Sequence, residues 1–509
     1  MFNKKILHTV ILGMAVFYVV FPIIVFLYGW TKKPIAVCGC ILCFYFMVRL
    51  IKELSYKAEF DVIDPKGHMI FWIVSVLLLA LWVLFSGIGG FSYQTWDFSA
   101  RNPMFHDLSD HPWPVYFNIS AEPLFAREMF GSGETQTATY IYYFAWWLPV
   151  AALTKLFHWS RAVSDAALLL WAVLGVFLSF YCLVCYLKKY SYWILAAVIL
   201  FGGMDFAMYV LMEGKVPFKG HVEWWAGYFQ YSSNSAQLYW VFNQSIPIWV
   251  VMSLLLLATD TKRKIGLCSL VFAYSPFAAI GIIPIAMASC IKIKGGGKNT
   301  IYKIFKDVVS TENIGIPFMM LCIFGTFYLQ NKNSLGQTGI IFLLHPEFKI
   351  LTVYIIFLVM EVLIYFLLVG RYAWNWEYYW IILTELILIP LYVAGKYNDF
   401  AMRVSIPAIY LMMVMVLKYL LDSQIKSDHN VRRRILAAAV VIGFLTSAVE
   451  LQRNISITLT ASEEEYLNDP VVSFEKVKYG SDEFTRLIFD QYLSVDYKDS
   501  LFYKYIAER

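Results

Sequence analysis

The sequence predicts an all-α polytopic membrane protein with about 11 full spans, a short broken hairpin and an extracytoplasmic layer of loops and interfacial helices. The composition supports this fold class, because 60% of the 509 residues are hydrophobic and only 15% are charged. Soluble domains contain roughly 45–50% apolar and about 25% charged residues. A helix that crosses a bilayer needs roughly 20 mostly apolar residues. Segments of this kind recur between residues 6 and 450 with no soluble domain between them.

Short basic clusters set the orientation of the predicted spans, because Lys and Arg concentrate in cytoplasmic loops. Lys4 and Lys5 place the N-terminus in the cytoplasm, where the clusters at 188–189, 262–264 and 432–434 are also expected. The first apolar run is too long for a signal peptide and is taken as a span. Full spans are then expected at 6–30, 34–51, 69–91, 163–187, 190–212, 244–259, 313–330, 350–370, 376–394, 401–421 and 434–451.

Two further apolar segments are excluded from this count. If residues 139–157 crossed the membrane, the next basic pair, at 188–189, would face outside. The aromatic and proline content of residues 139–157 is also typical of an interfacial helix. Residues 266–292 lie between two basic clusters, so the chain must return to the side from which it started. We expect two short helices or a re-entrant hairpin there, with a turn near Pro276, Gly281 and Pro284.

The sequence excludes several classes of function. Its net charge of +5 is spread over short loops, and it has no contiguous basic face for nucleic acid. It contains no Walker A loop, GxSxG elbow, HExxH pair or Rossmann fingerprint. The eight cysteines lie in or at the ends of apolar segments and lack the second ligand pair of a zinc site. We therefore assign them no metal and no disulfide.

The topology divides the chain into a multispanning domain over residues 1–451 and an extracytoplasmic C-terminal tail over residues 452–509. Within the first domain, the extracytoplasmic loops 92–138 and 213–243 hold most of the polar and aromatic candidates for a functional site. A loop of about 40 residues in a compact protein is usually either functional or disordered. The many aromatic residues of the first loop favour a folded layer against the membrane surface.

The first loop supplies a candidate catalytic carboxylate. Asp97 is the first acid after the third span and should lie near the membrane surface. Trp96 and Phe98 flank it and would exclude water, which raises its basicity. The structural alternative is an ion pair between Asp97 and Arg101. Further candidates for contacts to a substrate follow in the same stretch: Arg101, Asn102, His106 and Asp107.

The second loop and the span before it carry another set of candidates. Asp205 lies within an apolar span, where a carboxylate is costly and is functional by default, unless it pairs with a basic group or a helix end. His221 and Glu223 lie two residues apart and could share a face as ligands of a divalent metal, which stays an open alternative. Trp224 and Trp225 belong to an aromatic cluster that fits either an interfacial belt or stacking on sugar rings.

A third set lies near the start of the penultimate span. Asn398 and Asp399 precede the expected helix, where a carboxylate interacts favourably with the helix dipole. Arg403 follows one turn later, and its planar guanidinium matches the oxygens of a phosphate. The alternative for Arg403 is only an ion pair with Asp399 across one helical turn. His345 and Lys349 in a neighbouring loop are candidates to assist phosphate binding.

Three features together resemble the GT-C superfamily of glycosyltransferases: a large first external loop with a carboxylate soon after a span, an interfacial aromatic and proline-containing helix, and short paired spans. The resemblance covers roughly residues 69–421. It implies sugar transfer from a polyprenyl-phosphate carrier to a glycan, lipid or protein acceptor, outside a bacterial plasma (inner) membrane. The acid of the family's first loop corresponds to Asp97. Phe98 stands where some branches carry a second acid, which leaves metal dependence open.

The chemistry of such a transfer suggests a role for each candidate. Asp97 would act as the base that accepts the acceptor's proton, and Arg403, with His345 and Lys349, would hold the departing phosphate. The remaining candidates are assigned to the acceptor or the sugar, and no cofactor is assigned. The alternatives are a polymerase or ligase of lipid-linked cell-surface polysaccharide, or a flippase. A flippase would need a polar cavity that reaches both faces of the membrane.

Overall fold

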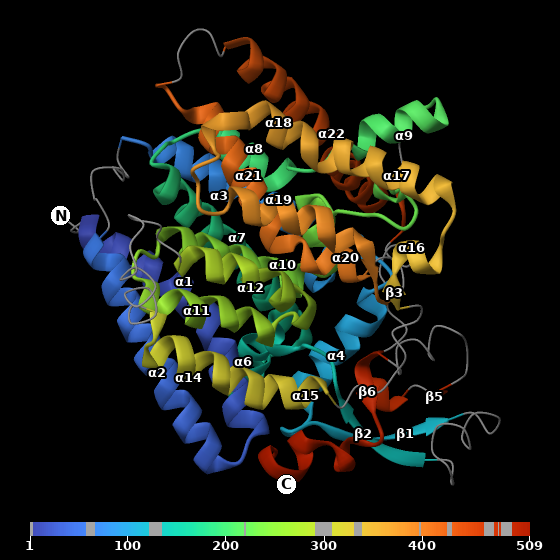
Figure 1. The fold of residues 1–509 in the computed structure, drawn as a ribbon. Coiled ribbons are helices and arrows are strands. Elements are labelled where there is room, and N and C mark those ends of the chain that lie inside the picture. Colours follow the sequence, from blue (N-terminus) through green and yellow to red (C-terminus); the bar gives the residue numbers. More distant parts are fainter. Residues whose placement is uncertain are drawn as a thin grey trace.

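Helices account for most of the protein (Figure 1). The computed structural model describes residues 4–57, 67–121, 135–217, 220–290, 308–329, 338–395, 399–424, 430–462, 473–476, 478–479 and 491–508. In this part of the chain, six helices are long and apolar enough to cross a membrane, or seven if the bent pair over residues 192–213 is one crossing. The structure therefore supports a helical protein suited to a bilayer, whereas about 11 full spans are not confirmed.

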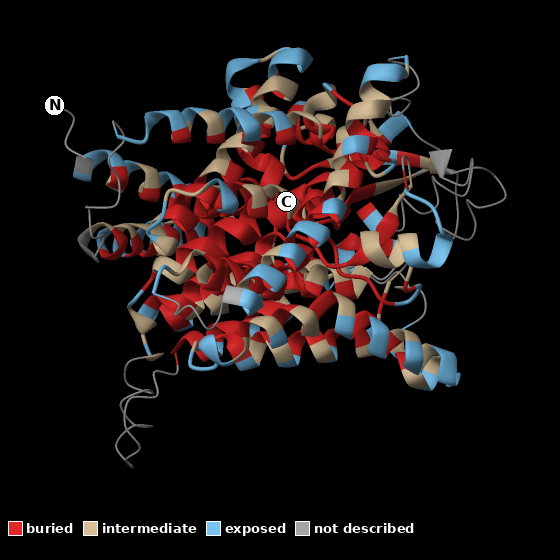
Figure 2. Cartoon of the chain, turned by 90° about the horizontal axis from the view of Figure 1, so that it is seen from above, coloured by how far each residue is buried: buried red, intermediate tan, exposed pale blue. Residues whose placement is uncertain are grey.

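The long helices combine a buried side with exposed apolar side chains. They are α1 (Lys4–Trp30), α2 (Lys33–Lys57), α7 (Arg161–Leu187), α10 (Asn234–Leu257), the segment Phe348–Tyr372 with α17 (Phe348–Leu358) and α18 (Ile364–Val369) joined by a π turn, and α22 (Asn430–Thr460). Figure 2 shows buried residues filling the centre, with exposed residues along the outer helices. Ile41 on α2 and Leu170 on α7 are both well exposed. Extensive exposed apolar surface of this kind fits contact with lipid.

Five described helices are apolar but shorter. They are α3 (Met69–Leu84), α6 (Leu148–Phe157), α12 (Pro276–Cys290), α19 (Tyr379–Leu388) and α21 (Ile406–Leu421). A helix of this class is at most about 24 Å long, which is less than the roughly 30 Å of bilayer hydrocarbon. With its preceding turn, α6 extends over Ala145–Phe157, so the segment 139–157 contains no helix long enough for a full crossing. That observation agrees with its exclusion from the predicted spans.

One predicted span is bent, and two predicted boundaries are wrong. The expected span 190–212 consists of α8 (Tyr192–Leu200) and α9 (Asp205–Glu213), which are bent by 54° relative to each other. The helix α10 begins inside the predicted loop 213–243, because the Ser233 side chain accepts a hydrogen bond from the Ala236 backbone N–H and caps the helix. The helix α22 continues past residue 451, so the first part of the predicted tail is helical.

The segment predicted to reverse direction does form a helical hairpin. Its first arm is α11 (Thr261–Ser269) with the short turn Leu270–Ala273, and its second arm is α12. The Lys264 ammonium in the first arm donates to the Ser289 carbonyl near the end of the second at 3.1 Å, so the chain returns to its starting point. The break falls just before Pro276, whereas the other two predicted turn residues lie inside α12.

Residues predicted to be cytoplasmic gather at one end of the molecule, which we call the inner end. There, Arg263 contacts Glu53 at 2.8 Å, Asp260 at 2.6 Å and Glu312 at 3.6 Å. Arg49 also contacts Glu312, at 3.4 Å. Glu312 lies in α14 (Thr311–Met320), which continues through a π turn into α15 (Thr326–Tyr328). These charges come from three chain segments that the basic clusters had placed on one side of the membrane.

The opposite end, which we call the outer end, contains a small sheet as well as helices. Its strand order is β5 (Lys478–Tyr479), β1 (Tyr116–Ala121), β2 (Thr135–Tyr140) and β6 (Leu493–Ser494). The C-terminal region therefore pairs with the first large loop, beside helix α4 (Phe98–Asp110) (Figure 1). A second sheet pairs β3 (Gly339–Ile340), followed by α16 (Ile341–Leu344), with β4 (Tyr392–Val393). Helix α20 (Asp399–Val404) follows this strand. The outer layer is thus folded, as expected, but is not purely helical.

Candidate functional site

A cavity of about 370 Å³ at the outer end combines residues from segments that are far apart in the sequence. It is lined by residues near 96–97, by residues between 221 and 241, by residues 399–403 and by Gln491. Ligand pockets typically measure roughly 300–1,000 Å³ and combine aromatic walls with a few polar groups. Six of the residues singled out from the sequence line this cavity: Asp97, His221, Glu223, Trp224, Asp399 and Arg403.

Asp97 lies at the start of α4, and its carboxylate accepts a hydrogen bond from Arg101 at 2.5 Å, one turn later in the helix. Arg101 is almost fully buried, and its guanidinium lies 5.9 Å from the Phe98 ring and 5.4 Å from the Phe242 ring. The Asp97 side chain stays 19% exposed at the cavity. The predicted ion pair is therefore present, and Asp97 is still accessible from the cavity.

The environment of Asp97 changes the pKa of its carboxyl group. Burial raises the pKa of Asp97, because removing water penalises the charged form. The positive charges of Arg101 and Arg403 act in the opposite direction, and the negative charge of Asp399 adds to the effect of burial. The net pKa lies above that of an ordinary aspartate. Such a shift brings a carboxylate closer to the strength that a general base needs.

Arg403 lies on the short helix α20 and lines the same cavity as Asp97. Its guanidinium contacts Asp399 at 2.8 Å, which is the predicted pair across one helical turn. The Arg403 side chain is 12% exposed, and its Nε atom has no hydrogen-bond partner among the described residues. An arginine with unused donors at a cavity wall is suited to bind an anion. Asn398, the neighbour of Asp399, lies outside the described residues.

His221 and Glu223 are held by protein groups rather than by each other. The His221 ring is hydrogen-bonded to Glu450 of α22, which also contacts Arg453 at 2.7 Å. Burial lowers the pKa of His221, whereas the charge and hydrogen bond of Glu450 and the charge of Glu223 raise it, and the net pKa lies above the ordinary value. Among the described residues, no group of three or more His, Cys, Asp or Glu side chains is placed to hold a metal ion.

Glu223 is fully buried and forms part of the cavity lining. It accepts hydrogen bonds from the Ser233 backbone at 2.9 Å, the Ser233 hydroxyl at 2.7 Å and Gln230 at 3.2 Å. Burial raises the pKa of Glu223, and the nearby Glu450 charge raises it further, whereas His221 and the Ser233 donors lower it. Because Ser233 also caps α10, Glu223 links the second loop to the helix that follows it.

Two tryptophans give the cavity an apolar wall. Trp96 is 46% exposed and Trp224 is 53% exposed. Trp240 lines the same cavity, and its indole N–H donates to Glu450 at 3.3 Å. Trp225 does not line the cavity, because its indole N–H donates to Asp205 at 2.9 Å. The cavity therefore combines exposed indole rings with charged groups.

The other predicted residues have contacts outside the cavity. Asn102 donates to Gln94 at 2.9 Å, His106 lies 3.8 Å from Asp165, and the buried Asp107 accepts a hydrogen bond from Tyr140 at 2.8 Å. The His345 ring stacks on Tyr228 at 4.3 Å, and Lys349 is exposed at the start of α17. None of these five side chains lines the cavity, which leaves Arg403 as the predicted phosphate ligand that does.

One buried acid that pairs with a predicted residue was not singled out from the sequence: Glu361, the partner of Asp205. Asp205 begins α9, and its carboxyl group interacts directly with that of Glu361, which lies in the π turn of the Phe348–Tyr372 segment. Isolated π turns are frequent at functional sites. Glu361 could have been found by the pattern that identified Asp205, because it is also an acid inside an apolar segment. The same pattern applies to Glu450.

The side chain of Glu361 lies so close to Gly203 that a larger residue at this position is expected to destabilise the fold. A Cβ atom at Gly203 would overlap the carboxyl group of Glu361, so Gly203→Ala must displace a buried acidic side chain. We expect a loss of about 1–3 kcal/mol or more, measured as a lower melting temperature and a lower yield of folded protein. Gly220→Ala is the control, because the nearest atom, the Tyr209 hydroxyl, lies 3.8 Å away. Equal stability of the two variants would contradict the packing at Gly203.

Comparison of the chain with known protein families, with curated proteins and with solved structures gave no match in any of the three. The chemistry of the cavity is therefore the basis for a functional proposal.

Proposed function

We propose that the protein is a membrane glycosyltransferase that moves a sugar from a polyprenyl-phosphate carrier to a glycan, lipid or protein acceptor on the extracytoplasmic side. One observation carries the proposal: a single cavity holds the carboxylate of Asp97, the guanidinium of Arg403 and the exposed rings of Trp96 and Trp224. These groups match the three parts of the reaction, namely a base, a phosphate ligand and a surface for a sugar.

The transfer exchanges one bond at the anomeric carbon of the sugar. The acceptor oxygen forms a new bond to this carbon, and the bond to the carrier phosphate breaks, so the phosphate leaves with the electron pair. Asp97 accepts the proton of the acceptor hydroxyl. The Arg403 guanidinium offsets the negative charge that develops on the phosphate, an electrostatic contribution that a water-poor cavity strengthens.

The cavity favours a transferase over a flippase. Its lining residues come from segments that the basic clusters place on the extracytoplasmic side and, for Met402 and Arg403, from the first residues of the predicted span 401–421. A flippase needs a polar path through the whole membrane, whereas this cavity is confined to one end of the molecule. A polymerase or ligase shares the same requirements as a transferase but takes a lipid-linked oligosaccharide as its donor.

A reconstituted assay distinguishes these functions. The purified protein, in lipid nanodiscs, is incubated with short-chain polyprenyl-phosphate monosaccharides or with polyprenyl-diphosphate oligosaccharides. Release of the free carrier and labelling of an acceptor are followed by mass spectrometry. Turnover of the monosaccharide donors supports the proposal, turnover of the oligosaccharide donors alone supports a polymerase or ligase, and binding without bond cleavage contradicts both.

The raised pKa of Asp97 predicts a pH dependence. A base works only when deprotonated, so the rate should fall as the pH falls through the pKa of Asp97, at a higher pH than the roughly 3.9 of an ordinary aspartate. Because the Arg101 charge lowers this pKa, Arg101→Gln should move the acidic limb of kcat/KM to higher pH. The pH dependence of kcat/KM is measured per folded molecule. If its acidic limb lies at the same pH in Arg101→Gln as in the wild type, a group other than Asp97 titrates there.

A further inference from the structure

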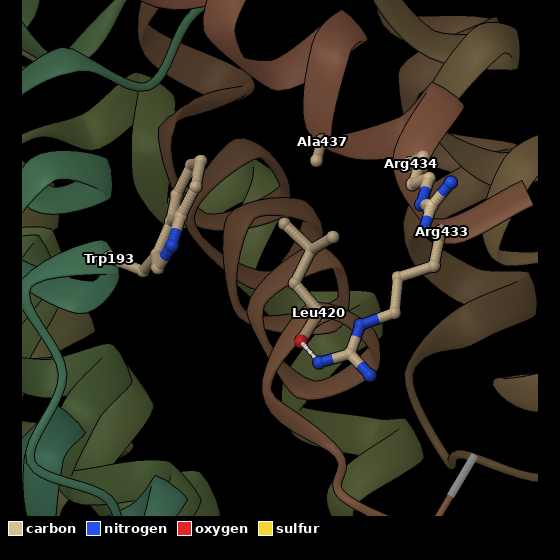
Figure 3. A pocket seen from close by; sticks show the side chains of 5 residues that line it. All are labelled: Trp193, Leu420, Arg433, Arg434 and Ala437. Carbon is tan, nitrogen blue, oxygen red and sulfur yellow. Dashed lines mark hydrogen bonds between the residues drawn. The ribbon is translucent and has the colours of Figure 1, made fainter. Parts of the chain in front are cut away.

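A second pocket lies at the inner end, where three helices meet. It has a volume of about 340 Å³ and is lined by Trp193 of α8, Leu420 of α21, and Arg433, Arg434 and Ala437 of α22 (Figure 3). Helix α21 separates it from the cavity described above, because Arg403 precedes the first turn of α21 and Leu420 lies in its last turn. This pocket is therefore a separate site.

The two arginines give the pocket an anion-binding wall. The Arg433 guanidinium donates to the Leu420 carbonyl and, at 3.2 Å, to the Asp422 carbonyl, which fixes it at the end of α21. These two contacts use two of the five N–H donors of a guanidinium. Arg434 is exposed and makes no hydrogen bond or ion pair with a described residue.

The carboxylate of Asp422, close to Arg433, is hydrogen-bonded to groups other than the two arginines. The Asp422 carboxylate accepts hydrogen bonds from the Tyr372 hydroxyl at 2.9 Å and from the Gln424 backbone N–H at 2.8 Å. Among the described residues, no carboxylate forms an ion pair with either arginine of the pocket. Two adjacent guanidinium groups without a carboxylate partner are suited to a phosphate, which accepts two parallel hydrogen bonds from an arginine.

The opposite wall of the pocket is apolar. Trp193 is 40% exposed and lies across the pocket from the arginines in Figure 3. Its ring centroid lies 6.3 Å from that of Phe444, farther along α22. Val441, one turn beyond Ala437, is 47% exposed. Apolar surface thus continues from the pocket along α22, away from the basic end of that helix.

We propose that this pocket binds an anionic phospholipid of the leaflet at the inner end, with its phosphate on Arg433 and Arg434 and an acyl chain along Trp193 and Val441. Basic pockets between membrane helices on the cytoplasmic side bind anionic headgroups, and tryptophan is enriched at the level of those headgroups. A free phosphate ion would use the arginines but would gain nothing from the apolar wall. The two sources of phosphate can therefore be separated by experiment.

The test uses the full-length protein and one lipid at a time. Binding of dioleoylphosphatidylglycerol, dioleoylphosphatidylcholine or inorganic phosphate is measured by native mass spectrometry and by the shift in melting temperature. We expect phosphatidylglycerol to bind and stabilise, with little effect from the other two. Equal binding of the two lipids, or equal stabilisation by inorganic phosphate, would overturn the proposal of a lipid site.

A matched pair of variants locates the site. Arg434→Gln should weaken phosphatidylglycerol binding about tenfold, because a hydrogen bond to a charged group contributes roughly that factor. Arg432→Gln removes the same charge from the same run but does not alter the pocket lining, and should bind normally. Arg433→Gln is less suitable, because Arg433 also caps α21. Equal losses in the first two variants would indicate general attraction to the basic segment and would overturn the assignment.

Discussion

Replacing Asp97 with asparagine is expected to slow sugar transfer roughly 10²–10⁴-fold, which is the usual contribution of a general base. Asparagine has nearly the same shape and retains an oxygen that can accept the hydrogen bond from Arg101. It cannot accept the proton of an acceptor hydroxyl. Binding of the carrier should be retained, because the group proposed to hold the phosphate is Arg403.

The structure makes the competing role of Asp97 testable in the same experiment. Arg101 is buried, and removing the partner of a buried charge costs up to about 3–5 kcal/mol. A purely structural Asp97 would therefore show itself as a lower melting temperature, with activity per folded molecule largely kept. Asp110→Asn is the control, because Asp110 ends the same helix but pairs with Arg161 away from the cavity. Near-normal transfer by folded Asp97→Asn would reject the base.

Replacing Arg403 with alanine is expected to weaken binding of the polyprenyl-phosphate donor by a factor of about 10–100. A hydrogen bond to a charged group is worth roughly 1.5–3 kcal/mol, and a factor of ten corresponds to about 1.4 kcal/mol. Arg403→Lys keeps the charge but loses the planar fork, so its affinity should lie between those of the wild type and the alanine variant. Donor affinity is measured by titration of the reconstituted protein.

A comparison with Asp399 separates phosphate binding from the helix ion pair. If Arg403 only pairs with Asp399 at 2.8 Å, then Arg403→Ala and Asp399→Asn should have similar effects on stability and none on donor affinity. If Arg403 holds the phosphate, Asp399→Asn frees a guanidinium and should leave donor binding at least as strong. Loss of affinity in both variants would point to a collapsed cavity rather than to a phosphate ligand.

The positions of the basic clusters along the sequence predicted that several of the cavity's residues lie on the same side of the membrane. The basic clusters placed Asp97, His221, Asp399 and Arg403 on one side of the membrane, and the structure brings all four to one cavity. The same reasoning predicted that residues 266–292 return to their starting side, because they lie between two basic clusters, and the structure has a hairpin over residues 261–290. These predictions needed only the sign of the charges and the length of the apolar runs.

What the sequence did not predict depends on contacts between distant segments. The partner of Asp205 is Glu361, and the partner of His221 is Glu450, yet both glutamates lie inside runs that were taken as ordinary spans. The strand β1 pairs with residues more than 300 positions away, a contact that no local pattern can reveal. The start of α10 was missed because its first turn is polar and is buried by neighbouring segments.

The pairing of the outer sheet has a consequence for how the protein is made. Strands β1 and β2 leave the ribosome early, whereas β6 and Gln491, which lines the cavity, follow only after the last long helix. At roughly 5–20 residues per second, the interval between β2 and β6 is on the order of 20–70 s. During that time, the edge of β2 that β6 will cover is open to chaperones or to misplaced strands. The cavity is therefore completed at the end of synthesis, so a nascent chain arrested before β6 should be inserted but inactive.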